Sequence, residues 1–550
     1  MFRMLRALVS LVWNLLALLG WPLRAIGRWA LGLRGPEWVE LRLAGPLRYR
    51  KRRPGWLERH LSRAPSSASI EEVADLCDRI VASRRCRGLL VRADGIHGSW
   101  AQLDALSAQL QRVHAAGRQV VVWAEALDGR SYAALCGVGR LVLPPSGTLD
   151  LTGPSLALSS AGAALGKLGL RPEFFRREEH KTAPELFTRV EASEAQRETA
   201  RGLLAEAHRK LSETLGKRLP PGEVQSALDR GPLTGRSALA AGLVDRVGFV
   251  DEALRELAPE KTRPGSGRRL RPGLPPLGLV PLRRGPAVGL VTLRGLIREG
   301  RSAELPTGGR FFGSQSAAEL LQAIRRDRSV RSVLLYVDSR GGSAGASELI
   351  WHEIERTAAE KPVVAYVDAV AASGGYFAAC GATRIVAAPL AIVGSIGVFY
   401  GRFDPGDALI RIGVRRELLR TSATSGLAQP WGAMNAEERA AADRIVGELY
   451  EEFLQVVAKS RRRTVEEIRA VAGGRIYTGQ RAGEIGLVDE VGGFARALEL
   501  TAELGGIRGK PKVRAYGSGA APLSWAGAVR DLAIGSRAGP LAFHDGPSLR

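Results

Sequence analysis

The chain of 550 residues contains two similar halves that are offset by 244 positions. Short segments of the first half recur in the second half at this constant interval. LVRAD at residues 90–94 matches LLYVD at 334–338, and AGLVD at 241–245 matches IGLVD at 485–489. A constant offset over this much of a chain indicates an internal duplication. Two related domains are therefore expected, and whatever the first copy folds into, the second copy folds into again.

Within each copy, apolar and β-branched runs alternate with segments of helical periodicity. The strands are predicted at 38–47, 88–93, 119–124, 287–297, 332–337 and 363–367, and the helices at 102–116 and 347–359. Capping-box motifs at Ser69 and Ser316 predict two further helix starts. Strands that alternate with helices predict a parallel sheet with helical crossovers, so we expect an α/β fold in both copies.

The composition limits the class of partner. The net charge of +23 is compatible with nucleic acid or with an anionic lipid surface. The arginines are scattered, however, and the sequence has no nucleic-acid motif or aromatic-interleaved basic patch, so no nucleic-acid partner is expected. The four cysteines have no CxxC spacing, which indicates neither a metal site nor a disulfide framework.

The amino-terminal segment is typical of a membrane anchor. Residues 7–23 carry no charge and are flanked by arginines on both sides. Seventeen residues is near the short limit for a spanning helix, which is about 17–25 residues. We expect a spanning anchor, and an amphipathic segment lying on the membrane surface is the alternative. Arginines on both sides leave the orientation undecided.

Five segments follow from these patterns. They are an anchor at 1–33, a first repeat at 38–257, a linker rich in Pro and Arg at 258–286, a second repeat at 287–505, and a low-complexity tail at 506–550.

One stretch of the second repeat is arranged like the nucleophile turn of an α/β enzyme. Residues 362–381 read PVVAYVDAVAASGGYFAACG, in which a β-branched run precedes Ser373 and a small-residue helix is predicted from about Tyr376. Free amides at a helix start can hold an oxyanion, and glycines let the backbone approach a substrate carbonyl. An ordinary glycine-rich turn between strand and helix is the alternative.

A nucleophilic serine needs a general base. No histidine lies between His352 and His544, and His352 is expected mid-helix as a solvated or packed side chain. His180 and Lys181 of the first repeat remain as candidates. A lysine can act as a base when burial makes it neutral, whereas arginine stays protonated. Ten of the 79 Lys and Arg residues are lysines, so each lysine near a candidate site is informative.

The two copies differ where this chemistry would lie. Gly129 stands at the position that matches Ser373, so the first copy has no nucleophile. The first copy carries Lys181 in the segment HKTAPELF, whereas the matching part of the second copy, around residues 422–425 (SATS), has no lysine. Lys361 and Lys459 of the second copy do not look buried.

Three motifs of the second repeat resemble those of the signal peptide peptidase A family, also called protease IV. They are DSRGGS at 338–343, ASGGY at 372–376 and GSIGV at 394–398. The resemblance is closest to the long form of the family and covers about residues 38–500. It implies two tandem domains of the crotonase and Clp-protease type behind an amino-terminal transmembrane helix.

The resemblance also implies a function. It predicts a serine endopeptidase of the bacterial inner membrane with its catalytic domains on the periplasmic side, assembled as a homo-tetramer and cleaving remnant signal peptides. No metal or cofactor is implied. The implied site consists of Ser373 as nucleophile, Lys181 as general base, Ser395 as the residue that orients the lysine, and the amides of Gly341 or Gly342 and of Gly374 as the oxyanion hole.

The sequence departs from the family pattern at Asp338-Ser339-Arg340-Gly341-Gly342, where Asn-Ser-Pro-Gly-Gly is usual. The two charged residues are expected beside the substrate groove, and they affect substrate preference more than catalysis. The alternatives are an acyl-CoA enzyme of the same fold, a catalytically inactive membrane scaffold, and a binder of anionic partners whose association would depend strongly on salt.

Overall fold

The computed structural model of the chain describes residues 2–23, 25–26, 36–50, 69–220, 222–257, 265–266, 270, 285–305, 309–429, 432–517, 521–522 and 541–543. The chain folds into two compact units. Unit 1 contains Met1–Pro154 and Ala207–Gly285, and unit 2 contains Ser155–Glu206 and Pro286–Arg550. The segment Ser155–Glu206 comes from the first repeat of the sequence but belongs to the second unit.

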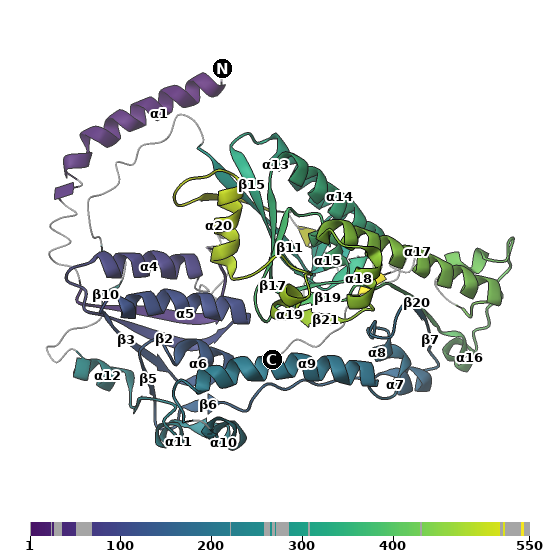
Figure 1. Cartoon of the computed structure of the whole chain (residues 1–550), viewed down its shortest axis with the longest axis horizontal. Coiled ribbons are helices and arrows are strands. Elements are labelled where there is room, and N and C mark those ends of the chain that lie inside the picture. Colours follow the sequence, from purple (N-terminus) through teal and green to yellow (C-terminus); the bar gives the residue numbers. More distant parts are fainter. Residues whose placement is uncertain are drawn as a thin grey trace. The chain divides into compact units, whose positions relative to one another are not determined.

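Unit 1 is built on a parallel six-stranded sheet (Figure 1). Its order is β10 (Gly265–Ser266), β1 (Trp38–Pro46), β2 (Gly88–His97), β3 (Gln119–Ala124), β5 (Arg140–Leu143) and β9 (Arg246–Val247). Helices α4 (Ile70–Ala82) and α5 (Trp100–Ala115) pack beside each other and form one apolar core with the strands. Each fully buried aliphatic side chain in such a core contributes about 1.5–3 kcal/mol.

The remaining elements of unit 1 are short. A second sheet joins β4 (Ala126–Asp128), β6 (Thr148–Asp150) and β8 (Leu233–Thr234). The helices are α6 (Gly129–Leu135), α10 (Glu223–Arg230), α11 (Gly235–Ala240) and α12 (Val250–Leu257). Helix α9 (Glu194–Leu215) begins in the segment assigned to unit 2 and ends in unit 1.

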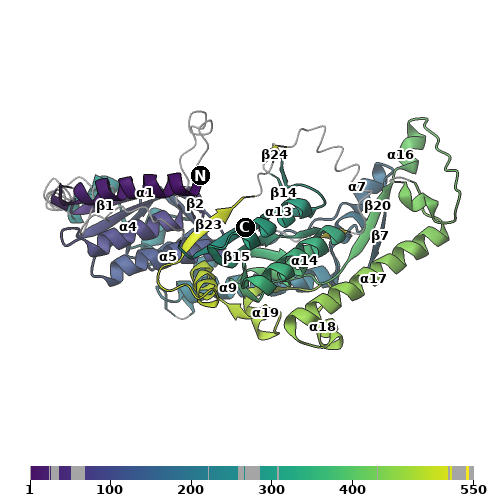
Figure 2. The same ribbon diagram turned by 90° about the horizontal axis from the view of Figure 1, so that it is seen from above.

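Unit 2 contains a larger sheet in the same α/β arrangement. The order is β21 (Ile476–Thr478), β19 (Ile392–Gly394), β17 (Val363–Ala372), β15 (Val330–Ser339), β11 (Ala287–Arg294) and β23 (Lys512–Tyr516), with β18 (Arg384–Ala387) and β22 (Glu490–Val491) extending from β17. These strands pair in parallel except for β21. Helices α13 (Ser314–Arg326) and α14 (Ala344–Glu360) lie side by side in unit 2 (Figure 2).

A further sheet in unit 2 brings together strands from distant parts of the chain. Its order is β24 (Ala521–Pro522), β13 (Ala303–Glu304), β14 (Arg310–Gly313), β12 (Leu296–Arg298), β16 (Gly341–Ser343), β25 (Leu541–Phe543), β20 (Phe399–Asp404) and β7 (Arg171–Arg176). Strand β7 belongs to the first repeat and pairs antiparallel with β20 of the second.

The other helices of unit 2 flank these sheets. They are α7 (Gly162–Lys167), α8 (Glu185–Thr188), α15 (Gly374–Ala379), α16 (Gly406–Arg411), α17 (Ala436–Arg461), α18 (Val465–Val471), α19 (Gly479–Glu484), α20 (Phe494–Leu504) and the short 3-10 helix at Ser425–Ala428.

The duplication recurs in individual hydrogen bonds. Tyr132 Oη donates to the carbonyl of Leu243 at 2.7 Å, and the matching Tyr376 Oη donates to the carbonyl of Leu487 at 2.6 Å. Each tyrosine is fully buried, so its hydroxyl requires a partner. The conserved spacing of the sequence repeat thus corresponds to the same tertiary contact in both copies.

Some boundaries differ from those expected. Ser69 caps α4 as predicted, accepting a hydrogen bond from the amide of Glu72. Ser316 does not cap α13, which starts at Ser314, because its hydroxyl instead accepts from the amide of Ser302. Strand β23 lies in the segment predicted as a low-complexity tail. Most of the linker predicted at 258–286 lies outside the described residues.

The amino-terminal helix α1 (Phe2–Leu19) covers much of the stretch expected to be an anchor. Among the described residues, no helix is long and apolar enough to cross a bilayer. The expected spanning anchor is therefore not supported.

Candidate active site

Ser373 lies in a sharp turn between β17 and α15. Its backbone has φ 53° and ψ −123°, and its amide donates to the carbonyl of Gly394 at 2.8 Å. A non-glycine residue in such a conformation is strained, and this kind of strain concentrates at functional sites. Strand β17 ends one residue before Ser373, and α15 begins one residue after it, at Gly374. The helix therefore starts two residues earlier than the predicted start at Tyr376, and the turn is correspondingly tighter.

Lys181 reaches this turn from the first repeat. It lies between β7 and α8, inside the segment Ser155–Glu206 that belongs to unit 2. Its Nζ is 2.9 Å from Ser373 Oγ, and it is 3.0 Å from both the carbonyl oxygen and Oγ of Ser395. Lys181 is 1% exposed and Ser373 is completely buried. The structure therefore brings together three of the residues predicted for the site.

Burial sets the protonation state of the lysine. Removal from water disfavours the charged ammonium and lowers the pKa of Lys181 from 10.5 to about 7. A neutral amine has two N–H groups and one lone pair. The two N–H groups can donate to the carbonyl oxygen and Oγ of Ser395. The lone pair is then left to accept a hydrogen bond from the hydroxyl of Ser373.

Ser395 follows β19 and is held in an uncommon conformation. Its φ is 52°, and its amide donates to the carbonyl of Arg475 at 2.6 Å. This conformation presents both the carbonyl and the hydroxyl of one residue to Lys181 Nζ. Ser395 is fully buried, so these acceptors are shielded from water.

Two glycines, to which the sequence analysis gave no role beside the lysine, leave room for Lys181; one of them, Gly397, belongs to the GSIGV motif. A Cβ on Gly474, whose φ is +79°, would lie 2.3 Å from the backbone nitrogen of Lys181. A Cβ on Gly397 would lie 3.2 Å from Lys181 Cδ. Any side chain at residue 474 would therefore displace the lysine backbone. In the sequence, the adjacent glycines at 473–474 were the feature that could have indicated a close approach of two backbone segments.

An ion pair between half-buried Arg176 and buried Glu185 supports the loop that carries Lys181, and the sequence analysis did not identify it. Arg176 Nη1 donates to the carbonyl of Lys181 at 3.1 Å and to Glu185 Oε1 at 2.7 Å. Glu185 is 3% exposed, and its negative charge is compensated by Arg176 and by Arg189, whose Nε lies 3.4 Å from the same carboxylate oxygen. The last residue of β7 and the first of α8 thus hold the backbone of Lys181 between them.

The glycines predicted for an oxyanion hole lie against the Ser373 turn. Gly341 has φ +98°. A Cβ added to Gly374 would lie 3.4 Å from the Cα of Gly341. The amide of Gly341 donates to Ser339 Oγ at 3.2 Å. Gly342 is in β16 and pairs with Ile297 of β12. The backbones of residues 341 and 374 are therefore in close proximity beside the serine.

Of the two charged residues that depart from the family pattern, Asp338 has an ion-pair partner. Asp338 forms an ion pair with Arg294 at 3.1 Å. Burial raises the pKa of Asp338, and the Arg294 charge opposes this effect. Arg340 is half-buried.

The other candidate bases do not contact Ser373. His180 Nε2 is 4.0 Å from Glu198, and His352 is exposed on α14. Lys361 Nζ donates to the carbonyls of Ile324 and Asp327 near the end of α13. Lys459 pairs with Glu355. Among the described residues, no group of three or more His, Cys, Asp or Glu side chains could hold a metal ion.

Comparison with known proteins identifies the family. The profile of peptidase family S49 matches residues 112–262 and 355–508, one segment in each repeat. The chain is 27% identical over 473 residues to the chloroplastic serine protease SPPA of Arabidopsis thaliana, covering 82% of this chain and 68% of the relative. It is 30% identical over 415 residues to Protease 4 of Salmonella typhi, covering 72% of this chain and 66% of the relative.

A third relative is Protease 4 of Haemophilus influenzae, which is 28% identical over 469 residues, covering 80% of this chain and 74% of the relative. The two profile matches together span more than half of the sequence and include the Lys181 segment and the Ser373 turn. The chain therefore belongs to peptidase family S49 and is a serine protease.

Proposed function

We propose that the protein is an endopeptidase in which Ser373 is the nucleophile and Lys181 is the general base. The observation that carries this proposal is the contact set of Lys181 Nζ, with Ser373 Oγ at 2.9 Å and two oxygens of Ser395 at 3.0 Å. Burying a lysine without a carboxylate partner costs more folding free energy than its contacts return, so it is not explained by stability. A neutral amine beside a serine hydroxyl is instead suited to acyl transfer.

The proposed reaction has two steps. Lys181 takes the proton from Ser373 Oγ as the oxygen attacks the scissile carbonyl, and the protonated lysine then gives that proton to the leaving amine. Water enters the acyl-enzyme, loses a proton to Lys181, and its oxygen attacks the ester. The proton returns to Ser373 Oγ as the ester C–O bond breaks, so the products are a carboxylic acid and an amine.

Backbone amides near Ser373 would stabilise the oxyanion. We assign this role to Gly374 together with Gly342. The amide of Gly341 donates to Ser339 Oγ, which favours Gly342 over Gly341 as the second donor. The proximity of the backbones at 341 and 374 supports a shared site.

An extended peptide is the expected form of the substrate. The carboxy-terminal strand β25 of the chain pairs antiparallel with β16, with Gly341 opposite Phe543 and Gly342 opposite Ala542. An added strand obtains affinity from main-chain hydrogen bonds and selectivity from alternate side chains. Signal peptides remaining after secretion are the substrate class that the family resemblance favours. We also propose that both repeats have the crotonase and Clp-protease type of fold, in keeping with their parallel sheets and helical crossovers.

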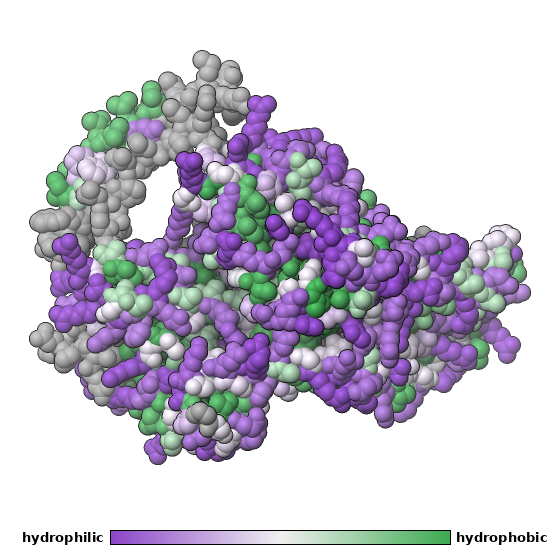
Figure 3. Space-filling view, in the orientation of Figure 1, coloured by the Kyte–Doolittle hydropathy of each residue, from purple (hydrophilic) through white to green (hydrophobic). Residues whose placement is uncertain are grey.

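Association with a lipid surface is a second part of the proposal. Apolar residues of α1, among them Leu11, Leu16 and Leu19, are more than half exposed. Figure 3 shows green, hydrophobic residues along this helix. An exposed apolar face flanked by arginines suits the boundary between headgroups and acyl chains. Flotation of the full chain with vesicles should be lost when residues 1–33 are removed.

Covalent labelling tests the nucleophile directly. A fluorophosphonate should modify Ser373 in the full chain, as located by mass spectrometry of peptides. The label should be absent in Ser373→Ala and slowed in Lys181→Arg. A peptide-hydrolysing Ser373→Ala variant would exclude the assignment, and a wild-type chain that neither binds the label nor cleaves peptides would favour an inactive scaffold.

A further inference from the structure

Residues 171–181 form a lysine arm, which begins with β7 and ends at the proposed general base. Strand β7 pairs antiparallel with β20 of the second repeat, and successive side chains of such a strand point to opposite faces. On one face, Arg176 donates to the carbonyl of Lys181. The other face carries Glu173, and Arg177 continues this face just beyond the strand. Both of these residues have ion-pair partners on α17, so the arm is held from the side away from the lysine loop.

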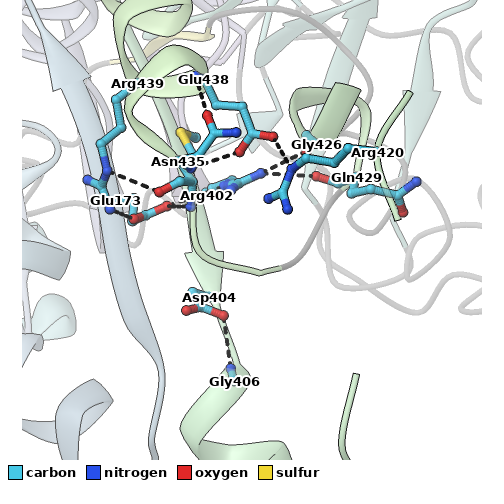
Figure 4. Close-up of polar contacts among 11 residues, drawn as sticks. Glu173, Arg402, Asp404, Gly406, Arg420, Gly426, Gln429, Asn435, Glu438 and Arg439 are labelled. Atoms are coloured by element: carbon cyan, nitrogen blue, oxygen red, sulfur yellow. Dashed lines mark hydrogen bonds and ion pairs between the residues drawn. The ribbon is translucent and has the colours of Figure 1, made fainter. Parts of the chain in front are cut away.

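Glu173 is the centre of a buried charge network (Figure 4). It stands directly opposite Arg402 in the strand pair, and its carboxylate accepts from Arg402 Nε at 3.4 Å and from the amide of Met434 at 3.3 Å. Arg439 of α17 donates to the same carboxylate. The side chains of Glu173 and Arg402 are 9% and 4% exposed, so loss of the acid would remove the carboxylate that pairs with a buried guanidinium. This network fixes β7 against both β20 and the start of α17.

A second contact with α17 lies four residues further along the arm. Arg177 donates to the two carboxylate oxygens of Asp443 at 2.9 and 2.8 Å, and to the main-chain carbonyl of the same residue at 2.9 Å. The guanidinium lies against Gly447, where an added Cβ would be 3.0 Å from Arg177 Nη2. Residues 439, 443 and 447 form one row on the helix. Because the two ion pairs have opposite polarity, sliding the arm by one contact would place Arg177 against Arg439. The order of the charges thus selects one register.

Arg177 also adjoins a strained part of the arm. Glu178 has φ +70°, and a non-glycine residue keeps such a conformation only where its surroundings impose it. The amide of Arg177 donates to the carbonyl of Val398 at 3.3 Å. Val398 belongs to the GSIGV motif, whose Ser395 binds Lys181 Nζ. Arg177 is therefore tied both to α17 and to the motif that receives the lysine.

The partners of the lysine arm are specific to the copy that receives the lysine. At the 244-residue offset, α17 corresponds to α9, and its row of Arg, Asp and Gly at 439, 443 and 447 corresponds to Ala, Thr and Leu at 195, 199 and 203. Leu158 stands at the position of Arg402, and Thr421 stands at the position of Arg177. The complementary divergence of the two repeats thus extends from the two site residues to the residues that hold the arm.

We propose that Glu173 and Arg177 are positioning residues for Lys181, and that their ion pairs with α17 set how far the lysine reaches toward Ser373. The inference rests on the proposed function, in which Lys181 is the general base. A misplacement of about 1 Å can cost roughly 10²-fold in rate. Arg177 contacts α17, whereas the edge proposed to bind a peptide is β16. Loosening this contact should therefore lower kcat and leave KM unchanged.

Charge reversal and its repair test the proposal, with kcat and KM measured for hydrolysis of a fluorogenic peptide by the full chain. Arg177→Glu and Asp443→Arg each bring two like charges together, and each should lower kcat by roughly 10–100-fold. The double variant restores an ion pair of reversed polarity and should recover most of this loss. Glu448→Arg is the matched control on the same helix. It reverses the partner of Arg444 where the two side chains are 63% and 65% exposed, and it should keep the wild-type kcat.

Melting temperature and pH dependence separate positioning from stability. The side chains of Arg177 and Asp443 are 33% and 50% exposed, and ion pairs with this exposure contribute little to stability, so the single variants should melt close to the wild-type chain. A lysine that is inserted less deeply is better hydrated, so the midpoint of the kcat/KM profile should move above the pKa of about 7. Arg177→Gln adds no acid near the lysine and should shift the midpoint in the same direction.

Three outcomes would overturn the positioning role. They are a wild-type kcat in Arg177→Glu, a double variant no more active than the single ones, and a loss of kcat that only follows a loss of melting temperature. Failure of the proposed function gives a different result, which is full activity in Lys181→Arg. The two proposals are therefore tested separately by one set of variants.

Discussion

Lys181 Nζ lies 2.9 Å from Ser373 Oγ, although the two residues come from different repeats and are 192 positions apart. Neither repeat holds both groups, since Gly129 occupies the position of the serine and residues 422–425 contain no lysine. The segment Ser155–Glu206 joins unit 2 and carries the lysine with it. Duplication followed by complementary loss thus leaves one candidate site in a chain with two repeats.

Replacing Lys181 by arginine should reduce kcat/KM by roughly 10²–10⁴-fold, the usual contribution of a general base. Arginine keeps the positive charge but remains protonated, so it cannot accept the proton of Ser373. Hydrolysis of a fluorogenic peptide measures the effect. Lys459→Arg is the matched control, because Lys459 is an exposed partner of Glu355, and this variant should keep wild-type activity. Full activity in Lys181→Arg would refute the proposed base.

The activity should rise with pH and level off above neutrality. Burial lowers the pKa of Lys181 to about 7, and only the neutral amine can act as the base. The profile of log kcat/KM against pH should therefore have a slope near one below pH 7 and a plateau above it. The measurement is a series of initial rates from pH 5.5 to 10.5. A profile that rises only near pH 10 would mean that the lysine is not desolvated as described.

Lys181 should also make the stability of the folded chain depend on pH. Its pKa is about 7 in the folded state and 10.5 when unfolded, so the unfolded state binds more protons between these values. Stability should therefore increase from pH 7 to pH 10.5. Lys181→Met removes this group, so the variant should melt at a higher temperature at pH 7, and the difference should shrink towards pH 10.5. A difference in melting temperature that is independent of pH would contradict this explanation.

The strands and helices that support the site follow from local patterns in the sequence. The β-branched run before Ser373 predicts β17, and the glycines after it predict a tight turn. The repeat offset identified where the two copies differ. These features depend on residues that are adjacent in sequence, which is why they are visible without coordinates.

Long-range contacts are the part that local patterns do not specify. Gly474 is separated from Lys181 by almost 300 positions, and its role comes from a backbone approach that no periodicity records. In the sequence, Arg176 and Glu185 look like ordinary surface charges, and only the structure shows that Glu185 is buried and paired with Arg176. The assignment of Ser155–Glu206 to unit 2 likewise depends on β7 pairing with β20, which is a tertiary event.

Gly474→Ala should abolish most of the activity through displacement of Lys181. The added Cβ would lie 2.3 Å from the backbone nitrogen of Lys181, so one of the two segments must move. Gly473→Ala provides a matched control, because Gly473 also has positive φ, +66°, but a Cβ there meets its nearest neighbour, Glu178, at 3.8 Å. In both variants an alanine adopts a positive φ, which should lower the stability of the folded chain by a similar amount, about 1–2 kcal/mol. Kinetics and melting temperature together separate the effects, and equal losses of activity in both variants would rule out the steric account.

Removal of residues 518–550 should lower KM for peptide substrates. Strand β25 pairs with Gly341, Gly342 and Ser343, which is the edge proposed to bind an extended peptide, so the tail and a substrate would compete for the same main-chain groups. The truncation leaves β23, which pairs with β11, so the central sheet stays complete. Initial rates for the truncated and full chains measure the change, and a synthetic peptide of residues 538–548 should inhibit the truncated chain competitively. An unchanged KM together with no inhibition would show that substrates bind elsewhere.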